Sequence, residues 1–505
     1  MITQFVGGSV LIRYASRHFH ETPRVRLATI ITLNIVEVAG ARHSAMSKLY
    51  FLGICGTFMG SLAVIARQLG HDVAGCDANV YPPMSDQLRA QGIHIDNGYD
   101  ASHLVSKPDL VIVGNAMTRN NPLTEALLES DLRFISGPQW LYENVLHGRH
   151  VLALSGTHGK TTTSSMLTWI LRENDDPCGY LIGGVPLGID ASADIGRSRN
   201  FVIEADEYDT AFFDKRSKFV HYHPRTLVIN NLEFDHADIF DDIEAIQWQF
   251  HQMIRIMPAS SLVLVPAASK PVAKMLERGC WSRTETLSLG VEDDADWWVE
   301  DMSRDGSVFT VKHRHCNQKT DVGRVEWQLT GQHNVSNGLA AIAAAADVGI
   351  SPQQAAAALS RFPGVKRRLE KIGEARGVTI IDDFAHHPTA IRSTLEAVRA
   401  AGAGRVIAVI EPRSNSMRLG VHREQLPASV VAADVVYWYQ PPGAQGDLKA
   451  VATASLPPSR VLSDVKEIIT EVVAQHRAGD TVVIMSNGGF EGIHMRLLET
   501  LRDSG

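Results

Sequence analysis

Cysteine is scarce in this chain of 505 residues, and its five cysteines lie far apart. No two of them form a C-x-x-C pair, the spacing that is typical of structural zinc sites and of thioredoxin-like redox sites. An odd number of scattered cysteines also argues against a disulfide framework. The cysteine usage therefore indicates a protein of the reducing cytoplasm. The five residues are Cys55, Cys76, Cys178, Cys280 and Cys316.

An excess of positive charge is also absent. The chain holds 48 Lys and Arg against 56 Asp and Glu, which gives a net charge of −8. Because nucleic acids attract proteins mainly through Lys and Arg contacts with phosphates, we do not expect a nucleic acid as the main partner. Long hydrophobic runs are missing too, since no apolar stretch reaches the ~18–20 residues that span a bilayer. We therefore expect no membrane insertion.

The first 45 residues differ in composition from the rest. They hold five arginines against two glutamates, together with the apolar patch LATIITLNIV. An arginine-rich, acid-poor stretch of this kind is typical of a transit-type peptide. The alternative is an upstream extension of a folded protein that begins at Met46, directly before a predicted strand. We favour the extension, and we expect residues 1–45 to be disordered.

Beyond this stretch, apolar runs such as KLYFLGICG, HVLALSG and RVIAVIEP alternate with helical patterns. The alternation predicts an α/β fold in which helices cover parallel sheets. Around residues 290–330 the runs become short and alternating, as in SVFTVKH and RVEWQLT, which predicts an antiparallel edge. Links that bear Pro and Gly, near Gly137–His150 and Phe362–Gly364, indicate two boundaries. We therefore predict three domains, at residues 46–147, 148–362 and 363–505.

The sequence SGTHGKTTT, at Ser155–Thr163, follows a predicted strand and opens a predicted helix. Gly156 and Gly159 allow a tight turn whose N–H groups point inward, and the helix N-terminus adds partial positive charge. Lys160 is then placed to reach the β- and γ-phosphates of a nucleotide, and the Thr161 hydroxyl to ligate Mg²⁺. This stretch predicts a nucleotide-binding turn.

One position departs from the usual phosphate loop, in which four residues separate a first glycine from the Gly-Lys pair. Leu154 occupies that place, so the loop is shorter than the common one. A glycine turn that simply joins a strand to a helix is the alternative. We favour the nucleotide site because the turn, the lysine and the threonines occur together, with Thr162 offering a further hydroxyl.

Acidic residues follow the next predicted strand, in FVIEADEYD. Ligands of open α/β sheets collect beyond the carboxyl ends of the strands, and carboxylates are ligands that Mg²⁺ prefers. Glu204 belongs to the strand end itself, so we expect it to bind Mg²⁺. Asp206 and Glu207 fit a metal role and an ordinary acidic loop about equally well.

The strand after that one ends in NNLEFDHADIF, where His236 lies between Asp235 and Asp238. A single histidine is most often a surface or capping residue. His236, however, lies just beyond the run TLVIN, next to the other two strand ends. We therefore expect it to be a second metal ligand or a gate on the γ-phosphate.

A glycine-rich turn also follows the first strand after residue 45. GICGTFMGSLA places Gly53, Gly56 and Gly60 after a strand, and Asp77 closes the next strand. The spacing is GxxGxxxG and not the GxGxxG of dinucleotide sites, so the signal is weak. It supports a ligand that carries a diphosphate, with NAD as one candidate. Glycines that only allow close helix–sheet packing are the alternative.

Five motifs in order resemble those of the Mur ligase family, the ATP-dependent amide-forming enzymes of peptidoglycan synthesis. They are SGTHGKTTT, EADE, NLEFDHAD, GQHNVSN and DDFAHHPTA, and the resemblance extends from Met46 to the C-terminus. It implies a UDP-binding Rossmann-like N-terminal domain, a central P-loop-type ATPase domain and a Rossmann-like C-terminal domain that receives the amine. It also implies that the N-terminal glycine turn holds UDP, which removes NAD as a candidate.

The resemblance implies roles for the residues at the motif positions. Lys160, Glu204 and His236 would be catalytic, with Thr161 and Glu204 on a first Mg²⁺ and His236 on a second. The residues implied to bind ATP are Gly156, Thr157, His158, Gly159, Lys160, Thr161, Thr162, His333, Asn334, Arg368 and Asp383. Those implied to bind UDP are Gly53, Gly56, Gly60 and Asp77, and those implied to meet the amine substrate are Arg413, Ser414 and Asn415.

A finer resemblance is carried by DANVYPPMSDQL, EADEYDTAFFDKRSKFVHY and EPRSNSMRLG. It implies a cytoplasmic ligase that joins UDP-N-acetylmuramate to the tripeptide L-Ala-γ-D-Glu-meso-diaminopimelate through an acyl phosphate, in peptidoglycan recycling. The alternative within the family is the addition of L-alanine to the same nucleotide. A UDP-sugar sensor without activity is an alternative of another class.

One feature departs from the family pattern. Several members place a carbamylated lysine on the second Mg²⁺. After FDHADIF this chain offers DDIEAIQWQFHQMIRIM, with acids and histidine but no convincing lysine. The remaining ligands of the second metal therefore stay open.

Overall fold

The computed structural model describes residues 3–6, 9–12, 46–81, 84–189, 191–290, 294–315, 318–443 and 448–503. The chain divides into two compact units, Met1–Ala39 and Gly40–Gly505. In the first unit, β1 (Thr3–Val6) pairs antiparallel with β2 (Ser9–Ile12). We expect residues 1–45 to be disordered. Apart from these two strands, those residues lie outside the part of the chain that the structure describes.

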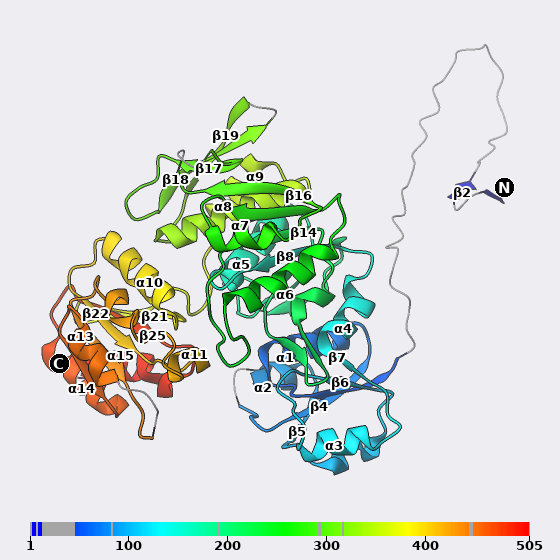
Figure 1. Ribbon diagram of the computed structural model, residues 1–505, viewed down its shortest axis with the longest axis horizontal. Helices are drawn as coiled ribbons and strands as arrows, with labels where there is room; N and C mark the ends of the chain where they lie inside the picture. The colour runs from blue at the N-terminus through cyan, green and yellow to red at the C-terminus, as the bar shows by residue number, and fades with distance from the viewer. Residues whose placement is uncertain are drawn as a thin grey trace, which may run out of the picture. The chain divides into compact units, whose positions relative to one another are not determined.

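The N-terminal domain is built on a parallel sheet of five strands in the order β5-β4-β3-β6-β7 (Figure 1). Four of the five residues of β3 are buried, as expected for a strand that helices cover on both faces. Its strands are β3 (Lys48–Leu52), β4 (Asp72–Asp77), β5 (His94–Asn97), β6 (Leu110–Val113) and β7 (Phe134–Ser136). Its helices are α1 (Thr57–Gln68), α2 (Met84–Ala90), η1 (Ala101–Ser106), α3 (Pro122–Leu128), α4 (Gly137–Leu141) and η2 (Tyr142–Leu146).

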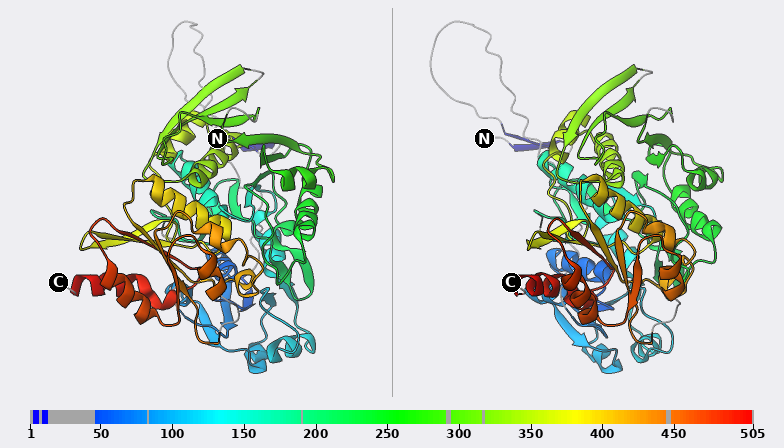
Figure 2. Two further views of the ribbon diagram at one scale, coloured as in Figure 1. Left: turned by 60° about the vertical axis from the view of Figure 1, so that its left-hand side comes forward. Right: turned by 90° about the vertical axis from the view of Figure 1, so that its left-hand side faces the viewer.

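The central domain contains a ten-stranded sheet in the order β10-β9-β11-β8-β14-β15-β16-β17-β18-β19. Strands β11, β8, β14 and β15 are parallel, whereas β17, β18 and β19 pair antiparallel. The antiparallel edge predicted around residues 290–330 is confirmed, and Figure 2 shows its long β18–β19 hairpin. The strands are β8 (His150–Ser155), β9 (Gly179–Leu181), β10 (Ala193–Asp194), β11 (Asn200–Glu204), β14 (Thr226–Ile229), β15 (Leu262–Pro266), β16 (Arg283–Ser288), β17 (Trp297–Glu300), β18 (Val308–His315) and β19 (Gln318–Glu326).

The helices of the central domain are α5 (Lys160–Glu173), α6 (Ile243–Arg255), α7 (Lys270–Leu276), α8 (Gln332–Asp347) and α9 (Pro352–Leu359). Between β11 and β14 the chain also forms a small antiparallel hairpin that the sequence patterns did not indicate. It consists of β12 (Asp209–Ala211) and β13 (Asp214–Ser217), and the short helix η3 (Lys218–His221) follows it.

The C-terminal domain has a six-stranded sheet in the order β20-β21-β25-β22-β23-β24, in which only the pairing of β20 with β21 is antiparallel. Its strands are β20 (Glu370–Ala375), β21 (Val378–Asp383), β22 (Val406–Ile410), β23 (Val435–Tyr439), β24 (Ser459–Leu462) and β25 (Thr481–Met485). Its helices are α10 (Pro388–Ala400), α11 (Asn415–Arg418), α12 (Leu426–Ser429), α13 (Leu448–Ala454), α14 (Val465–Gln475), η5 (Phe490–Gly492) and α15 (Ile493–Asp503).

The first two domains are joined by a common hydrophobic core, and the C-terminal domain is not part of it. One cluster runs from Phe51 and Leu62 of the N-terminal domain to Phe201 and Phe219 of the central domain without a break. The C-terminal domain keeps its own clusters on the two faces of its sheet. The first two domains therefore share a core, and the third has an independent one.

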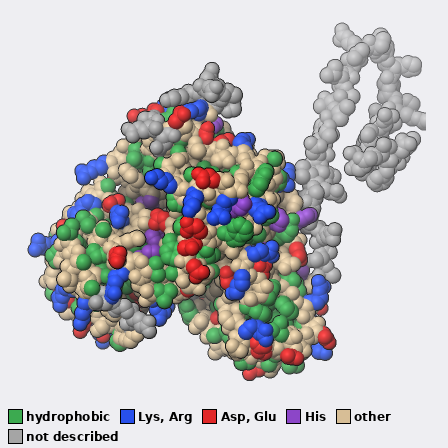
Figure 3. Space-filling model, viewed as in Figure 1, with side chains coloured by type: hydrophobic (Ala, Val, Ile, Leu, Met, Phe, Trp, Pro, Cys, Tyr) green, Lys and Arg blue, Asp and Glu red, His purple; other side chains and the backbone are tan. Residues whose placement is uncertain are grey.

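On the face shown in Figure 3, Lys and Arg side chains are interspersed with Asp and Glu and form no single basic surface. Among the described helices, none is both long and apolar enough to cross a membrane.

Candidate active site

The predicted phosphate turn lies between β8 and α5, where β8 runs between β11 and β14. Gly156 and Gly159 adopt positive φ angles of 128° and 82°, which side chains rarely tolerate. A Cβ at Gly159 would lie 2.4 Å from Asn337 Oδ1, so the turn also needs glycine there for space. Lys160 and Thr161 open α5, so the expected turn, lysine and helix N-terminus occur together.

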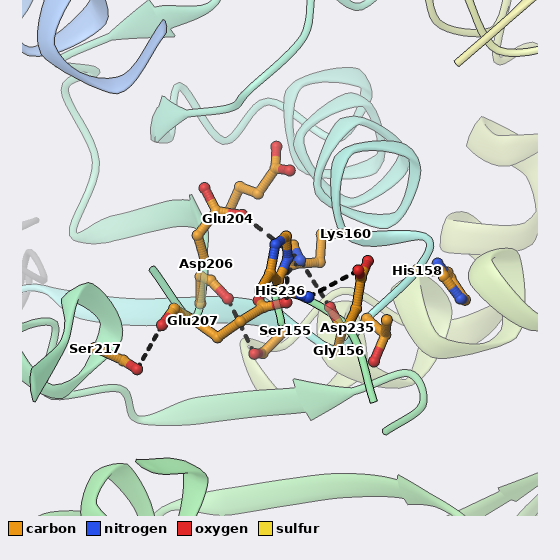
Figure 4. A network of polar contacts seen from close by, with 12 residues as sticks. Ser155, Gly156, His158, Lys160, Glu204, Asp206, Glu207, Ser217, Asp235 and His236 are labelled. Atoms are coloured by element: carbon orange, nitrogen blue, oxygen red, sulfur yellow. Dashed lines mark hydrogen bonds and ion pairs between the residues drawn. The ribbon is translucent and has the colours of Figure 1, made fainter. Parts of the chain in front are cut away.

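Lys160 is buried, and its ammonium group joins the turn to the neighbouring acidic loop (Figure 4). Its Nζ donates to Gly156 O at 2.8 Å and to Glu207 Oε2 at 2.9 Å, and Asp206 Oδ1 lies 3.6 Å away. The other oxygen of Glu207 is 3.1 Å from His236 Nε2. Glu207 therefore links two of the three predicted catalytic residues.

Lys160, Glu207 and His236 each stabilise the charged form of a neighbour in this group. Burial alone would lower the pKa of Lys160, but Glu207 and Asp206 outweigh burial and raise it. Burial would raise the pKa of Glu207, yet Lys160 and His236 lower it to about 2. The pKa of His236 is raised because the hydrogen bond and charge of Glu207 outweigh its burial. A lysine cation, a carboxylate and an imidazole that favours its charged form thus lie where a triphosphate would bind.

Glu204, at the end of β11, contacts Thr161, whereas Glu207 contacts Lys160. Its Oε1 accepts the Thr161 hydroxyl at 2.8 Å, and its Oε2 accepts Gly183 N at 2.6 Å. Burial, and then the charge of Asp206, raise the pKa of this carboxyl group. Among the described Lys, Arg and His side chains, none lies within 4.0 Å of it. A buried carboxylate beside a hydroxyl and without a cationic partner fits a divalent cation.

His236 has a positive φ of 54° and follows Asp235, whose Oδ1 accepts the His236 backbone N–H at 2.7 Å. The ring of Tyr208 lies 4.4 Å from the ring of His236. His236 is thus joined to Thr161 and Glu204 only indirectly, by way of Glu207 and Lys160. A shared metal role for all three stays a prediction.

Three asparagines that the sequence analysis did not identify form hydrogen bonds that hold the phosphate turn and the start of α5. Asn231 Oδ1 accepts His158 N at 2.8 Å. Asn230 Nδ2 donates to Thr163 Oγ1 at 2.8 Å, and Thr163 Oγ1 in turn donates to Asn337 Oδ1 at 3.2 Å. Asn337 belongs to the GQHNVSN motif, so its identity was visible in the sequence, but its distance to the turn was not.

Of the residues outside the turn that were implied to bind ATP, Arg368 contacts Thr161. Arg368 Nη2 donates to Thr161 Oγ1 at 3.3 Å. Burial lowers the pKa of Arg368, although the charge of Asp383 opposes this change. Burial, and then the charge of Arg368, lower the pKa of His333 to about 4, so this imidazole is neutral at pH 7. Asn334 Nδ2 donates to Thr330 O at 2.8 Å.

His158 lies apart from Lys160, as Figure 4 shows. It contacts His387 of the C-terminal domain instead. Its ring lies 4.7 Å from that of His387, and Glu233 Oε2 is 3.7 Å from both His158 Nε2 and His387 Nδ1. The donor atoms of this trio lie within 4.8 Å of one another, a spacing that a metal ion could use. His387 Nδ1 already accepts Thr389 N at 3.3 Å, so we interpret the trio as a contact between domains.

In the N-terminal glycine turn, Gly53 and Gly56 border open space, whereas Gly60 is packed against a neighbouring side chain. Gly53 has a positive φ of 79°, and a Cβ at Gly56 would meet only Gly53 O at 3.5 Å, which leaves open space for a ligand. A Cβ at Gly60 would lie 2.2 Å from Met84 Sδ, so packing explains that glycine. Asp77 Oδ2 accepts Cys55 N at 2.9 Å and thereby fixes the turn.

A cavity of about 510 Å³ adjoins the phosphate site. It is lined by Tyr81 of the N-terminal domain, by Tyr208 and His236 of the central domain, and by residues 413–416 and 487–491 of the C-terminal domain. Arg413, Ser414 and Asn415, which were expected to meet the amine substrate, are among the lining residues. A Cβ at Gly488 would lie 2.1 Å from Arg413 Nη1, so only glycine lets this arginine lie where it does.

Comparison with known protein families gives three consecutive matches. The chain matches "Mur ligase family, catalytic domain" over residues 48–149, "Mur ligase middle domain" over residues 154–345, and "Mur ligase, glutamate ligase domain" over residues 367–488.

Individual relatives are similar over almost their whole length. The chain is 52% identical over 456 residues to the UDP-N-acetylmuramate–L-alanyl-γ-D-glutamyl-meso-2,6-diaminoheptandioate ligase of Escherichia coli (strain K12), which covers 90% of this chain and 98% of the relative. It is 30% identical over 477 residues to the UDP-N-acetylmuramate–L-alanine ligase of Syntrophomonas wolfei, which covers 90% and 97%. A crystal structure of a murein peptide ligase from Psychrobacter arcticus 273-4 matches with a TM-score of 0.71 and 48% identity, over 90% of this chain and 99% of that chain.

Proposed function

This chain belongs to the Mur ligase family, and from that premise we propose that it joins the carboxyl group of UDP-N-acetylmuramate to the amino group of L-Ala-γ-D-Glu-meso-diaminopimelate, with hydrolysis of ATP. The observation that carries the choice of amine is the 52% identity to the E. coli tripeptide ligase, against 30% to an L-alanine ligase. A role in peptidoglycan recycling and a cytoplasmic location follow from these substrates.

The reaction needs an activated carboxyl group, because direct attack of an amine on a carboxylate would have to expel oxide. In the proposed sequence, the lactyl carboxylate of the sugar nucleotide attacks the γ-phosphorus of ATP and ADP leaves. The free amine then attacks the acyl phosphate, loses a proton, and phosphate departs as the amide forms. Each step uses only the three substrates.

Two anions must first come together. At ~4 Å and an effective dielectric constant near 20, a carboxylate and a phosphate oxygen repel by about 4 kcal/mol. Lys160, held by Gly156 O and Glu207, supplies a fixed positive charge against this repulsion. His236 lies on the other oxygen of Glu207 and extends the positive field toward the cavity.

Thr161 and Glu204 are the residues that would hold Mg²⁺. His236 is proposed as the ligand of a second ion, which would bind the imidazole only after its extra proton has left. When bound, Mg²⁺ would neutralise phosphate charge and so favour phosphoryl transfer. Arg368, which reaches the Thr161 hydroxyl, places a further cation next to this position.

We also propose a division of labour between the three domains. Residues 46–147 would bind UDP, residues 148–362 would bind ATP, and residues 363–505 would bring the peptide. The cavity lined by all three supports this division, because the carboxylate, the γ-phosphate and the amine must meet in one place. A C-terminal domain that closes on the site would also keep water from the acyl phosphate.

The proposal is tested by incubating the protein with ATP, Mg²⁺ and UDP-N-acetylmuramate, together with either the tripeptide or L-alanine. Mass spectrometry of the products identifies the amine that is joined. We expect the tripeptide adduct and release of one phosphate per adduct. An L-alanine adduct alone would assign the alternative ligase activity. If neither amine causes phosphate release, the result would favour a UDP-sugar sensor without activity.

A further inference from the structure

Lys218 is a buried lysine that the proposed reaction does not yet use. It opens η3 directly after β13, and only 5% of the residue is exposed. Its Nζ lies 5.0 Å from the centre of the Phe58 ring and 5.5 Å from that of the Tyr208 ring. Two aromatic faces from different domains therefore surround this ammonium group.

The cation has no direct counter-ion in the part of the chain that the structure describes. No carboxylate oxygen there lies within 4.0 Å of Lys218 Nζ, whereas Lys160, which is also buried, has Glu207 at 2.9 Å. Burial lowers the pKa of Lys218, although the charges of Asp206, Glu207 and Asp209 oppose this change. A buried charge without a partner is energetically unfavourable, and such a group is retained most readily where a ligand supplies the partner.

The position of Lys218 indicates which ligand. Phe58 is the second residue of α1, whose N-cap is Gly56 of the proposed diphosphate turn. Tyr208 packs on His236 at 4.4 Å and lines the cavity in which the substrates would meet. Lys218 thus lies between the expected site of the UDP diphosphate and the phosphate-transfer site.

The β12–β13 hairpin, which directly precedes Lys218, is fixed at both of its ends. Phe213, in the turn between β12 and β13, packs edge-on against Phe134 of β7 in the N-terminal domain, with ring centres 5.3 Å apart. At the other end of the hairpin, the Ser217 hydroxyl donates to Glu207 O at 2.6 Å. Packing on one side and a hydrogen bond on the other therefore fix the backbone before Lys218.

We propose that Lys218 is a substrate-binding residue whose ammonium group binds an oxyanion of the sugar nucleotide. The inference rests on the proposed function, and it adds a residue that binds the carboxylate donor. The oxyanion is the lactyl carboxylate or the diphosphate, since both belong to one substrate and Lys218 lies between their expected sites. Binding of this anion would supply the direct counter-ion that the described residues do not provide.

The test replaces Lys218 with methionine, which keeps the length of the side chain and removes its charge. Titration calorimetry measures the affinity of the full-length protein for UDP-N-acetylmuramate and, separately, for UDP. We expect Lys218→Met to weaken UDP-N-acetylmuramate binding by about 10- to 100-fold, the usual effect of losing a hydrogen bond to a charged group. The melting temperature without ligand should stay the same or rise, because an unpaired buried charge is removed.

Lys215→Met is the matched control. Lys215 lies in the hairpin that directly precedes Lys218, but its side chain is 70% exposed and its Nζ is paired with Asp209 at 2.7 Å. We expect this variant to bind both ligands as the wild type does. If Lys218→Met does not fold, Lys218→Gln is measured in its place, and Lys218→Arg should recover part of the lost affinity.

The outcomes separate the possibilities. Loss of affinity for UDP-N-acetylmuramate alone assigns the carboxylate, and equal loss for UDP assigns the diphosphate. Unchanged affinity for both ligands, or a lower melting temperature with unchanged affinity, would show a structural lysine and overturn the inference. If the wild type itself does not bind UDP-N-acetylmuramate, the proposed function fails instead.

Discussion

At the scale of single residues, the character of Lys160 depends on its neighbours. Its position at the start of α5 was evident from the sequence, but its charge is held by Glu207 and by Gly156 O. A lysine this buried would favour its neutral form without such a carboxylate. Glu207 is therefore as important to the proposed chemistry as the lysine that the motif identifies.

Lys160→Ala should abolish ligation while leaving the sugar nucleotide bound. Removing a charge that faces the transferred phosphoryl group is expected to reduce kcat by at least about 10³-fold. The affinity for UDP-N-acetylmuramate, measured by calorimetry, should stay within about twofold, because Lys160 is assigned to the phosphates of ATP and not to the sugar nucleotide. Lys466→Ala, on the exposed side of α14, serves as the control. Loss of both properties together would contradict the division of labour.

Glu207→Gln should lower stability in a pH-dependent way. Glu207 has a folded pKa of about 2, below its usual value of about 4.3, so its stabilising effect is present above about pH 4.5 and is lost toward pH 2. His236 has a raised folded pKa, so its contribution is full below its usual value of about 6.5 and is lost as the pH rises through the folded value. Both contributions depend on the Glu207 charge. The variant should therefore be least stable relative to wild type at about pH 5–6.

Thermal unfolding from pH 3 to pH 8 measures this difference. Breaking a buried ion pair costs about 3 kcal/mol or more, so the melting temperature should fall by several degrees at pH 5–6. The gap between variant and wild type should narrow toward pH 3. Glu499→Gln, at an exposed position of α15, should follow the wild-type curve. A gap that stays constant with pH would refute the ionic account.

At the scale of elements, the turn between β8 and α5 depends on the parts behind it. Asn230 and Asn231 follow β14, and Asn337 comes from α8, more than a hundred residues later in the chain. The turn is thus fixed before any nucleotide arrives, which lowers the entropic cost of binding.

Gly159→Ala tests this support. The substitution would strain a backbone with φ of 82° and place a Cβ 2.4 Å from Asn337 Oδ1. We expect a stability loss of about 1–3 kcal/mol and ATP affinity reduced at least tenfold, measured by thermal unfolding and calorimetry. Gly148→Ala is a close control, because Gly148 has φ of 83° but nothing within 4 Å of its Cβ. Equal effects of both variants on ATP affinity would show that crowding by Asn337 is unimportant.

At the scale of the whole molecule, the C-terminal domain meets the central domain through polar contacts, while the first two domains share a hydrophobic core. The Ser416 hydroxyl donates to Asp235 Oδ1 at 2.6 Å and accepts Ala237 N at 3.2 Å. Asn415 Nδ2 donates to Asp238 Oδ2 at 2.7 Å, and Thr389 Oγ1 to Glu233 Oε2 at 2.7 Å. Domains that meet through polar contacts of this kind commonly move relative to each other, which suits a domain that opens and closes.

Ser416→Ala should therefore impair the use of the peptide more than the binding of the sugar nucleotide. Loss of a hydrogen bond to a carboxylate, at about 1.5 kcal/mol or more, predicts that kcat/KM for the tripeptide falls about tenfold. The affinity for UDP-N-acetylmuramate and the melting temperature should change little. Ser463→Ala, an exposed serine of the same domain, is the control. An equal loss for both substrates would indicate a general distortion of the site.

Much of the fold and part of the site could be predicted because the signals are local. The alternation of apolar runs and helices gave the parallel sheets, and the change of pattern near residues 290–330 gave the antiparallel edge. The phosphate turn was predicted from residues that follow one another in the chain. The hairpin β12–β13 was missed because its short, polar strands in DTAFFDKRS have little periodicity.

The sequence by itself determined which residues end the strands, because strand, turn and helix are coded by neighbours in the chain. Only the tertiary structure decided which of them touch. The order β11-β8-β14 and the path of the loop after β11 place Glu207 between Lys160 and His236, while Glu204 faces Thr161. Packing between domains buried Lys218 against Phe58. Local periodicity carries no information on such contacts, since they arise when surfaces far apart in the chain are buried together.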